Sequence, residues 1–358
     1  MQWEALQGHE RQKGWFAAAL ASGRLASSFL FVGPDGIGKR TFATLLAKGL
    51  LCRKTPPQSL EACGVCEDCA QVDALTHPDL LTIAKPADKA FLPIELLIGD
   101  REKRMRSGLC YDISLRPFSG RRKIAIIDDA DAFNTEGANC LLKTLEEPPP
   151  DSVLILLGTS LQRQLPTIRS RCQAILFKPL QADQLQTLIL RHGICDSQER
   201  AGQLAKQSSG SLAEARILVD PELDDFREQL LAKLSQSQLP LVDLAKSCGG
   251  IVEAAGKDAR IKRDRLKWLL RLSANFYRDL TLSFDAVQSE LSLPINSGGT
   301  PSMSAAIQDC RSHWRCGERG AALAWSRCLL ATEQVDRNAN QTALLESWAA
   351  DIAQIGGC

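Results

Sequence analysis

Short runs of apolar residues, each bounded by turn-forming residues, dominate the first half of the chain. Ser28–Val32, Lys123–Ile127 and Val153–Leu157 have the length and apolar character of buried strands. Between them, Lys39–Leu51 and Thr135–Leu145 carry apolar residues at helical spacing. Strands that alternate with helices predict a parallel sheet in an α/β domain.

The pattern changes after Pro179 and again near Pro221. Beyond the first point only helical periodicity is found. Beyond the second the amphipathic stretches become long, for example at residues 263–280 and 321–352, with no convincing strand, and residues 291–304 have the composition of a loop. We therefore predict an α/β domain at residues 1–178, a small helical domain at 179–219 and an all-helical domain at 220–358.

Composition narrows the classes of partner. Lys and Arg number 43 and Asp and Glu 42, so a net charge of +1 gives no overall field toward nucleic acid or an anionic membrane. Aromatic residues make up only 5% and do not alternate with basic ones as they do in a platform that stacks single strands. The first residues lack a signal-peptide pattern and no apolar run reaches membrane-spanning length, so we expect a cytoplasmic protein.

A glycine-rich turn joins the first predicted strand to the first predicted helix. Gly33, Gly36 and Gly38 would let backbone N–H groups turn inward around phosphate oxygens, and Lys39 would reach the outer phosphates. The helix start that follows favours negative charge. The turn predicts a site for ATP or ADP, and the alternative is a glycine-rich turn with an exposed lysine.

The residues that would handle magnesium depart from those of a hydrolase. The position after the lysine normally carries a hydroxyl that ligates Mg²⁺, but here it holds Arg40. Thr41 lies about 100° further around the helix. Asp128 and Asp129 end the second predicted strand, where the first would hold Mg²⁺ through water and the second would orient the attacking water. Phosphates, water and Asp128 could still hold Mg²⁺, though less well, and the alternative is a solvated acidic turn.

Four of the 13 cysteines have the spacing of a metal site. Cys52, Cys63, Cys66 and Cys69 form a C-x10-C-x2-C-x2-C array. Four thiolates without His or an acid favour a closed tetrahedral Zn²⁺ site with a structural role. A cysteine-ligated iron–sulfur centre and four unrelated reduced cysteines are the alternatives.

Together these features resemble the clamp-loader branch of the AAA+ family, which includes the bacterial gamma/tau and delta-prime subunits of DNA polymerase III. The array between the two nucleotide motifs is typical of the bacterial members. The run A-N-C-L-L-K-T-L-E-E-P-P at residues 138–149 and T-I-R-S-R-C at 167–172 match two further family motifs. The resemblance covers residues 8–218, and the rest is similar only in being helical, as the collar domain of the family is.

The resemblance implies an AAA+ domain with a zinc module at about 52–69, a helical lid and a collar that holds the oligomer together. It implies delta and gamma/tau subunits, the sliding clamp and, through the complex, primed-template DNA as partners, and no membrane. The protein would then act in the bacterial cytoplasm, associated with the nucleoid at replication forks.

The resemblance also assigns roles to single residues. Arg171 would be an arginine finger that enters the ATP site of a neighbouring subunit, and Thr159 or Ser160 would sense the terminal phosphate. Hydrolysing members carry Glu where this chain has Asp129, and a lid arginine where it has Ala213. With Arg40, these departures favour a delta-prime-type member that donates a finger and hydrolyses ATP poorly or not at all.

Three other interpretations stay open at this point. Lys39 and Asp128 are intact, as an ATP-hydrolysing motor of the gamma/tau type requires. A nucleic-acid-binding adaptor could use the glycine-rich turn at residues 33–39 and the zinc module together, although no basic stripe supports it. The chain could also be an AAA+ scaffold that no longer binds nucleotide.

Overall fold

The computed structural model describes residues 2–56, 58–86, 89–256, 258–285 and 301–357. The chain forms two compact units, the first made of Met1–Leu188 with Gly210–Ala213 and the second of Ile189–Ser209 with Glu214–Cys358. The division into three domains inferred from the sequence stays a prediction. Among the described residues, no helix is both long and apolar enough to cross a membrane.

The first unit is built on a five-stranded sheet with the order β2-β3-β4-β1-β5, in which every neighbouring pair is parallel. This confirms the predicted parallel α/β fold, and all three predicted strands are present. The strands are β1 (Ser28–Val32), β2 (Leu80–Ile83), β3 (Lys123–Ile127), β4 (Ser152–Gly158) and β5 (Gln173–Leu176). The sequence analysis missed β2 and β5, the two four-residue edge strands.

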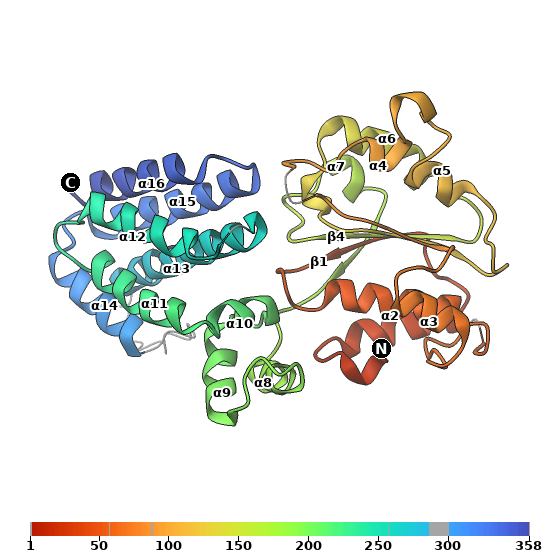
Figure 1. Cartoon of the computed structure of the whole chain (residues 1–358), viewed down its shortest axis with the longest axis horizontal. Coiled ribbons are helices and arrows are strands. Elements are labelled where there is room, and N and C mark those ends of the chain that lie inside the picture. The colour runs from red at the N-terminus through yellow and green to blue at the C-terminus, as the bar shows by residue number, and fades with distance from the viewer. Residues whose placement is uncertain (1, 57, 87–88, 257, 286–300, 358) are drawn as a thin grey trace. The chain divides into compact units, whose positions relative to one another are not determined.

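Alternate side chains of the inner strands enter two separate cores, as the pleat of a strand requires. Phe29 and Phe31 of β1 pack into a core that includes Phe16 and Phe42, whereas Leu30 and Val32 pack into the core on the opposite face. Figure 1 shows α2 and α3 on one face of the sheet and α4, α5 and α6 on the other. The sheet is therefore covered on both faces, and its three inner strands are buried along their whole length.

The helices of the first unit precede, connect and follow its strands. They are α1 (Glu10–Ala21), α2 (Lys39–Leu51), α3 (Glu67–Asp73), α4 (Glu95–Ile98), α5 (Leu109–Ser114), α6 (Thr135–Glu146), α7 (Pro166–Arg169) and α8 (Ala182–Arg191), with 3-10 turns at Trp3–Ala5, Arg101–Lys103 and Ala130–Ala132. The helix α8 continues by three residues into the second unit. The predicted helices at residues 39–51 and 135–145 correspond to α2 and α6.

The described part of the second unit is helical. Its helices are α9 (Gln198–Gln207), α10 (Leu212–Leu218, whose first two residues belong to the first unit), α11 (Pro221–Leu234), α12 (Leu241–Glu253), α13 (Ala259–Asp285), α14 (Pro301–His313), α15 (Gly317–Asp336) and α16 (Gln341–Gly356). The long helix α13 packs along α15, and α16 packs on α12 and α15. Tyr277 of α13 and Trp348 of α16 are fully buried in this unit.

Two details of the predicted helical region need correction. The stretch from Ala321 to Ile352 was expected to be continuous, but α15 ends at Asp336 and α16 begins at Gln341. The predicted loop at residues 291–304 lies outside the described residues up to 300, and α14 already begins at Pro301.

The segment that follows α2 returns onto that helix. The indole Nε1 of Trp3 donates to the carbonyl oxygen of Leu60 at 3.0 Å, and the Trp3 ring packs edge-on against Phe42 at 5.0 Å between centroids. A Cβ atom at Gly49 would lie 2.3 Å from the oxygen of Leu60. The absence of a side chain at Gly49 therefore lets the backbone of the returning segment touch α2.

We predict that Gly49→Ala destabilises the first unit by about 1–3 kcal/mol, because the added methyl group overlaps a backbone oxygen that cannot move freely. Gly14→Ala is the matched control, since Gly14 also lies inside a helix but has open space around it. This control should be stabilised by about 0.5–1 kcal/mol. Urea unfolding of the two variants measures the difference, and equal free energies of unfolding would contradict the close contact.

Candidate functional site

The phosphate loop at residues 33–39 connects the carboxyl end of β1 to α2, as the sequence predicted. Gly36 and Gly38 have φ angles of +74° and +100°, which favour glycine. The ammonium of Lys39 donates to the carbonyl oxygens of Gly33 at 2.6 Å and Pro34 at 2.7 Å. Burial lowers the pKa of Lys39, although the nearby carboxylate of Asp35 acts in the opposite direction. The lysine thus already lies within the loop that would hold the phosphates.

A segment distant in sequence covers one side of the loop. The hydroxyl of Ser211 donates to the Asp35 oxygen at 2.8 Å, and the Leu212 N–H donates to the Gly36 oxygen at 3.0 Å. A Cβ atom at Gly36 would lie 2.5 Å from that of Ala213, which stands at the position of the lid arginine. The start of α10 therefore contacts the loop through its backbone and small side chains, with no cation at that position.

Arg40, in the first turn of α2, forms an ion pair with Asp128 at the end of β3. Its Nη1 lies 3.2 Å from Oδ2 of Asp128, while Oδ1 of the same carboxylate accepts from the N–H of Asp129 at 3.0 Å. Thr41 is half-buried one residue further along α2. The guanidinium of Arg40 is thus paired with the carboxylate that was predicted to hold Mg²⁺.

Asp129 adopts a strained backbone conformation, with φ at +55° in the left-handed region. Its Oδ2 accepts from the N–H of Lys85, just beyond β2, at 3.2 Å. Burial and the charge of Asp128 both raise the pKa of Asp129. The carboxylate is thus hydrogen-bonded toward β2, and it is one methylene shorter than Glu.

Thr159, which follows β4, is hydrogen-bonded to a third acid that the sequence analysis did not single out. The hydroxyl and N–H of Thr159 donate to Oδ2 of Asp131 at 2.6 and 2.8 Å, and the amide of Gln164 contacts Oδ1. Burial raises the pKa of Asp131. The neighbouring hydroxyl of Ser160 accepts from the N–H of Arg163 at 3.3 Å. The position of Asp131 in D-D-A-D was the available signal.

The four cysteines of the predicted metal site lie together. Cys52 is the C-cap of α2, Cys66 is the N-cap of α3 and Cys69 lies within α3, and Cys63 comes from the intervening loop. All four sulfur atoms are within 4.8 Å of one another, with 3.9 Å between Cys52 and Cys66 and 4.0 Å between Cys63 and Cys69. Four sulfurs around a tetrahedral Zn²⁺ would be about 3.8 Å apart. The cluster therefore fits a closed zinc site.

The cysteines differ in how readily they ionise without a metal. Burial raises the pKa of Cys69 to about 12. For Cys52 the effect of burial is outweighed by hydrogen bonds from Cys63 and other donors, and its pKa falls to about 6. A zinc ion bound here must therefore displace at least the proton of Cys69, which makes metal binding depend on pH.

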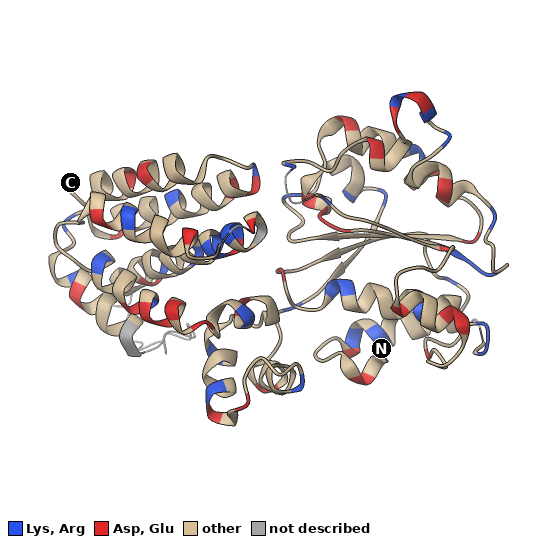
Figure 2. Cartoon of the chain, viewed as in Figure 1, with Lys and Arg blue, Asp and Glu red and all other residues tan. Residues whose placement is uncertain are grey.

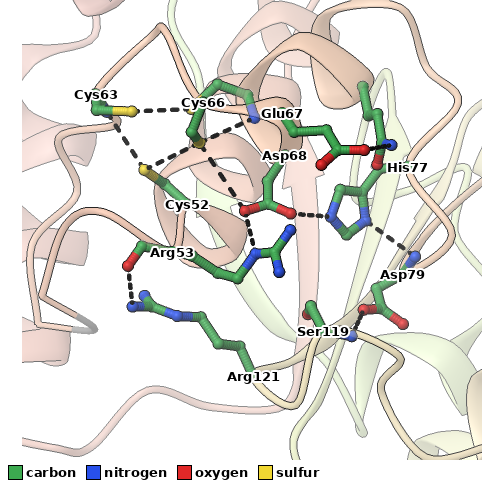
Figure 3. Close-up of polar contacts among 12 residues, drawn as sticks. Cys52, Arg53, Cys63, Cys66, Glu67, Asp68, His77, Asp79, Ser119 and Arg121 are labelled. Atoms are coloured by element: carbon green, nitrogen blue, oxygen red, sulfur yellow. Dashed lines mark hydrogen bonds and ion pairs between the residues drawn. The ribbon is translucent and has the colours of Figure 1, made fainter.

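A network of charged residues lies next to the cysteine cluster (Figure 3). The carboxylate of Asp68, which is buried next to Cys66, accepts from Nε of Arg53 at 2.7 Å, and the hydrogen bond lowers the pKa of Asp68. Nδ1 of His77 accepts from the Asp79 N–H at 3.0 Å, so Nε2 carries the proton and faces Asp68 at 3.4 Å. Arg121 donates to the carbonyl oxygen of Arg53. The network ties α3, which carries Cys69, to the residue that follows Cys52.

Arg171 lies at the amino end of β5, on the edge of the sheet opposite to the phosphate loop. Strands β1 and β5 run parallel with Phe29 opposite Gln173, so residues just before β5 lie near the start of β1. The guanidinium of Arg171 donates from Nε to Glu146 at 2.7 Å and from Nη1 to the oxygen of Thr167 at 2.9 Å. Arg171 and Glu146 border a cavity of about 470 Å³.

Comparison with known proteins gives this geometry its context. A family model described as DNA polymerase III, delta subunit, matches residues 8–181. DNA polymerase III subunit delta' of Pseudomonas aeruginosa is 34% identical over 63% of this chain and 66% of its own length. The chain is similar to delta-prime subunits of the DNA polymerase III clamp loader. Subunit tau of Escherichia coli is also similar, with 31% identity over 66% of this chain and 35% of its own length.

A solved structure of a DNA polymerase III gamma-subunit-related protein from Thermotoga maritima shows 18% identity and a TM-score of 0.41, over 83% of this chain and 99% of that one. A likeness of that size decides nothing about function. The chain spans about two thirds of the matched delta' protein and about one third of the tau protein. Activity and partners therefore remain proposals for this chain.

We predict one Zn²⁺ per chain, held by the four clustered cysteines. Cys69→Ser should lose the metal and lower the Tm of the first unit by about 5 °C or more, because zinc sites of this kind stabilise the fold around them. Cys195→Ser is the matched control, since Cys195 lies outside the cluster with its thiol near the Ser197 oxygen. Metal analysis and thermal unfolding are the measurements.

A colourless chain that is folded and free of metal would overturn the zinc assignment. Bound iron together with visible absorption would instead identify the site as an iron–sulfur centre.

Proposed function

We propose that this chain works as the delta-prime subunit of the DNA polymerase III clamp loader. In that role it assembles with delta and gamma/tau subunits into a heteropentamer and helps to load the sliding clamp onto primed-template DNA. It donates Arg171 to the ATP site of a neighbouring subunit and hydrolyses ATP weakly or not at all. The observation that carries the proposal is the location of Arg171.

The sheet prevents Arg171 from serving its own phosphate loop. Arg171 comes two residues before β5 and Gly33 comes directly after β1, and the two strands are parallel neighbours. A five-residue strand is about 17 Å long, which separates the two edges by more than an arginine side chain can span. A role for Arg171 at an ATP site therefore requires a second subunit, as in an arginine finger supplied in trans.

The nucleotide side of the chain supports binding better than hydrolysis. Gly33, Gly36, Gly38 and Lys39 form the loop that we propose to hold ATP or ADP. Arg40 stands where a metal-ligating hydroxyl is needed, and Asp129 is tied to the Lys85 N–H. The lid contributes Ala213 in place of a cation. Each change weakens a different element of phosphoryl-transfer catalysis.

Two other functions are less well supported. A gamma/tau-like motor is favoured by the intact Lys39 and Asp128, and it predicts brisk ATP turnover by the isolated chain. A nucleic-acid-binding adaptor predicts strongly salt-dependent DNA binding by one chain. Figure 2 shows Lys and Arg mixed with Asp and Glu on most helices of both units, whereas α13 is richer in Lys and Arg than in Asp. With a net charge of +1, the chain as a whole offers little attraction to a phosphate backbone.

We predict that Arg171→Ala abolishes the turnover of the ATP site that this residue completes. Loss of a trans finger lowers the rate of ATP hydrolysis at such a site by about 10³-fold or more. The clamp- and DNA-stimulated ATPase rate of the reconstituted loader should therefore fall by the fraction that this one site contributes. Arg24→Ala is the matched control, because Arg24 is exposed just before β1 on the same edge of the sheet. Assembly, checked by gel filtration, should be normal for both variants.

The isolated wild-type chain is measured as a further control, and its rate of ATP hydrolysis should be close to zero. Brisk turnover by the chain alone, combined with an unchanged loader carrying Arg171→Ala, would reject the proposal in favour of a self-sufficient motor.

A further inference from the structure

We propose that the guanidinium of Arg40 replaces magnesium in this nucleotide site, so that the phosphate loop takes a nucleoside di- or triphosphate free of metal. The inference rests on the proposed binding of nucleotide by the loop. It goes beyond that function by assigning the ionic form of the ligand and the residue that determines it.

The residues present do not suit Mg²⁺. This ion binds oxygen atoms in octahedral geometry and usually combines one or two carboxylates with phosphates and waters. Where its hydroxyl ligand is expected, the chain has the cationic fork of Arg40. Asp128 accepts hydrogen bonds at both oxygens, from Arg40 at 3.2 Å and from the Asp129 N–H at 3.0 Å. A divalent ion at Asp128 would have to displace a positive charge that is fixed to the same chain.

The other carboxylates near the loop are also engaged. One oxygen of Asp129 accepts from the Lys85 N–H, and both oxygens of Asp131 face donors from Thr159 and Gln164. The carboxylate of Asp35 lies 3.9 Å from the Lys39 ammonium. None of these four acids, including Asp128, presents a carboxylate without a neighbouring donor or cation, so another Mg²⁺ ligand would have to be released from its present contact.

Arg40 can neutralise phosphate charge itself. Its side chain is 54% exposed and contacts Asp128 through Nη1, so the salt bridge is partly solvated and can be exchanged for another anion. A guanidinium presents five N–H donors in a planar fork that matches phosphate oxygens. With Lys39 beside it, the start of α2 offers two cations at the place where a hydrolase offers one lysine and one metal ion.

The test measures binding of a fluorescent ADP analogue to the whole chain as Mg²⁺ is added. Magnesium should be removed by treating the buffers with a resin, because a strong chelator in solution would also strip the proposed zinc. We expect the wild-type dissociation constant to change by less than about 2-fold between no Mg²⁺ and millimolar Mg²⁺. Arg40→Ser, which restores the hydroxyl, should bind about 10-fold or more tightly with Mg²⁺ than without it.

Two further variants keep the result interpretable. Arg24→Ser removes an exposed arginine from the opposite edge of the sheet and should behave as wild type. Asp128→Asn frees the guanidinium from its acid without touching Arg40, and it should tighten metal-free binding about 3-fold or more. This variant decides the matter if Arg40→Ser does not fold.

The inference would be overturned if the wild-type chain bound the analogue only with Mg²⁺. It would also be overturned if Mg²⁺ did not change the affinity of Arg40→Ser, or if the wild-type chain bound no analogue under any condition. The outcome is separate from that of the finger experiment. Arg171 acts in a neighbour's site, so loss of ATPase in the Arg171→Ala loader would stand even if this chain bound no nucleotide.

Discussion

The common direction of the five strands is the constraint on which the first unit depends. A parallel sheet places all carboxyl ends on one edge and all amino ends on the other. The phosphate loop, Asp128 and Thr159 therefore gather on one edge because each follows a strand, whereas Arg171 precedes a strand and lies on the other. One polypeptide thus carries the proposed phosphate site on one edge and, on the other, an arginine that cannot reach it. The separation follows from topology, so it does not depend on any single contact.

The helix α2 links the phosphate loop to the cysteine cluster. It begins at Lys39 and ends one residue before Cys52, so the two candidate sites lie at the ends of an element about 20 Å long. Near its carboxyl end, the buried ammonium of Lys48 pairs with Asp73 of α3 at 2.6 Å. The cysteine cluster and this ion pair therefore lie at the end of the helix that is not fixed by the loop. Zinc bound by the cluster would stabilise that end and take no part in the proposed chemistry.

The sequence predicted the parts of the fold in which one signal dominates. Continuous apolar runs revealed β1, β3 and β4, because buried central strands have no polar face. The edge strand β5 has mostly exposed residues, and β2 has only Leu80 buried, so periodicity could not find them. Cysteine spacing identified the group of four cysteines, since they are close in sequence as well as in space. The contact of Asp131 with Thr159 joins residues 28 positions apart, which no local pattern reports.

The ion pair of Arg171 with Glu146 raises the question of whether the proposed finger can leave its own subunit. The Arg171 side chain is 31% exposed and that of Glu146 is 49% exposed, so water screens the pair. Pairs of this kind contribute about 0–1 kcal/mol. A trans finger contributes about 10³-fold or more to catalysis, equivalent to about 4 kcal/mol. The transition state in a neighbouring site would therefore outcompete Glu146 for the guanidinium. The ion pair with Glu146 is therefore too weak to keep Arg171 from moving into a neighbouring ATP site.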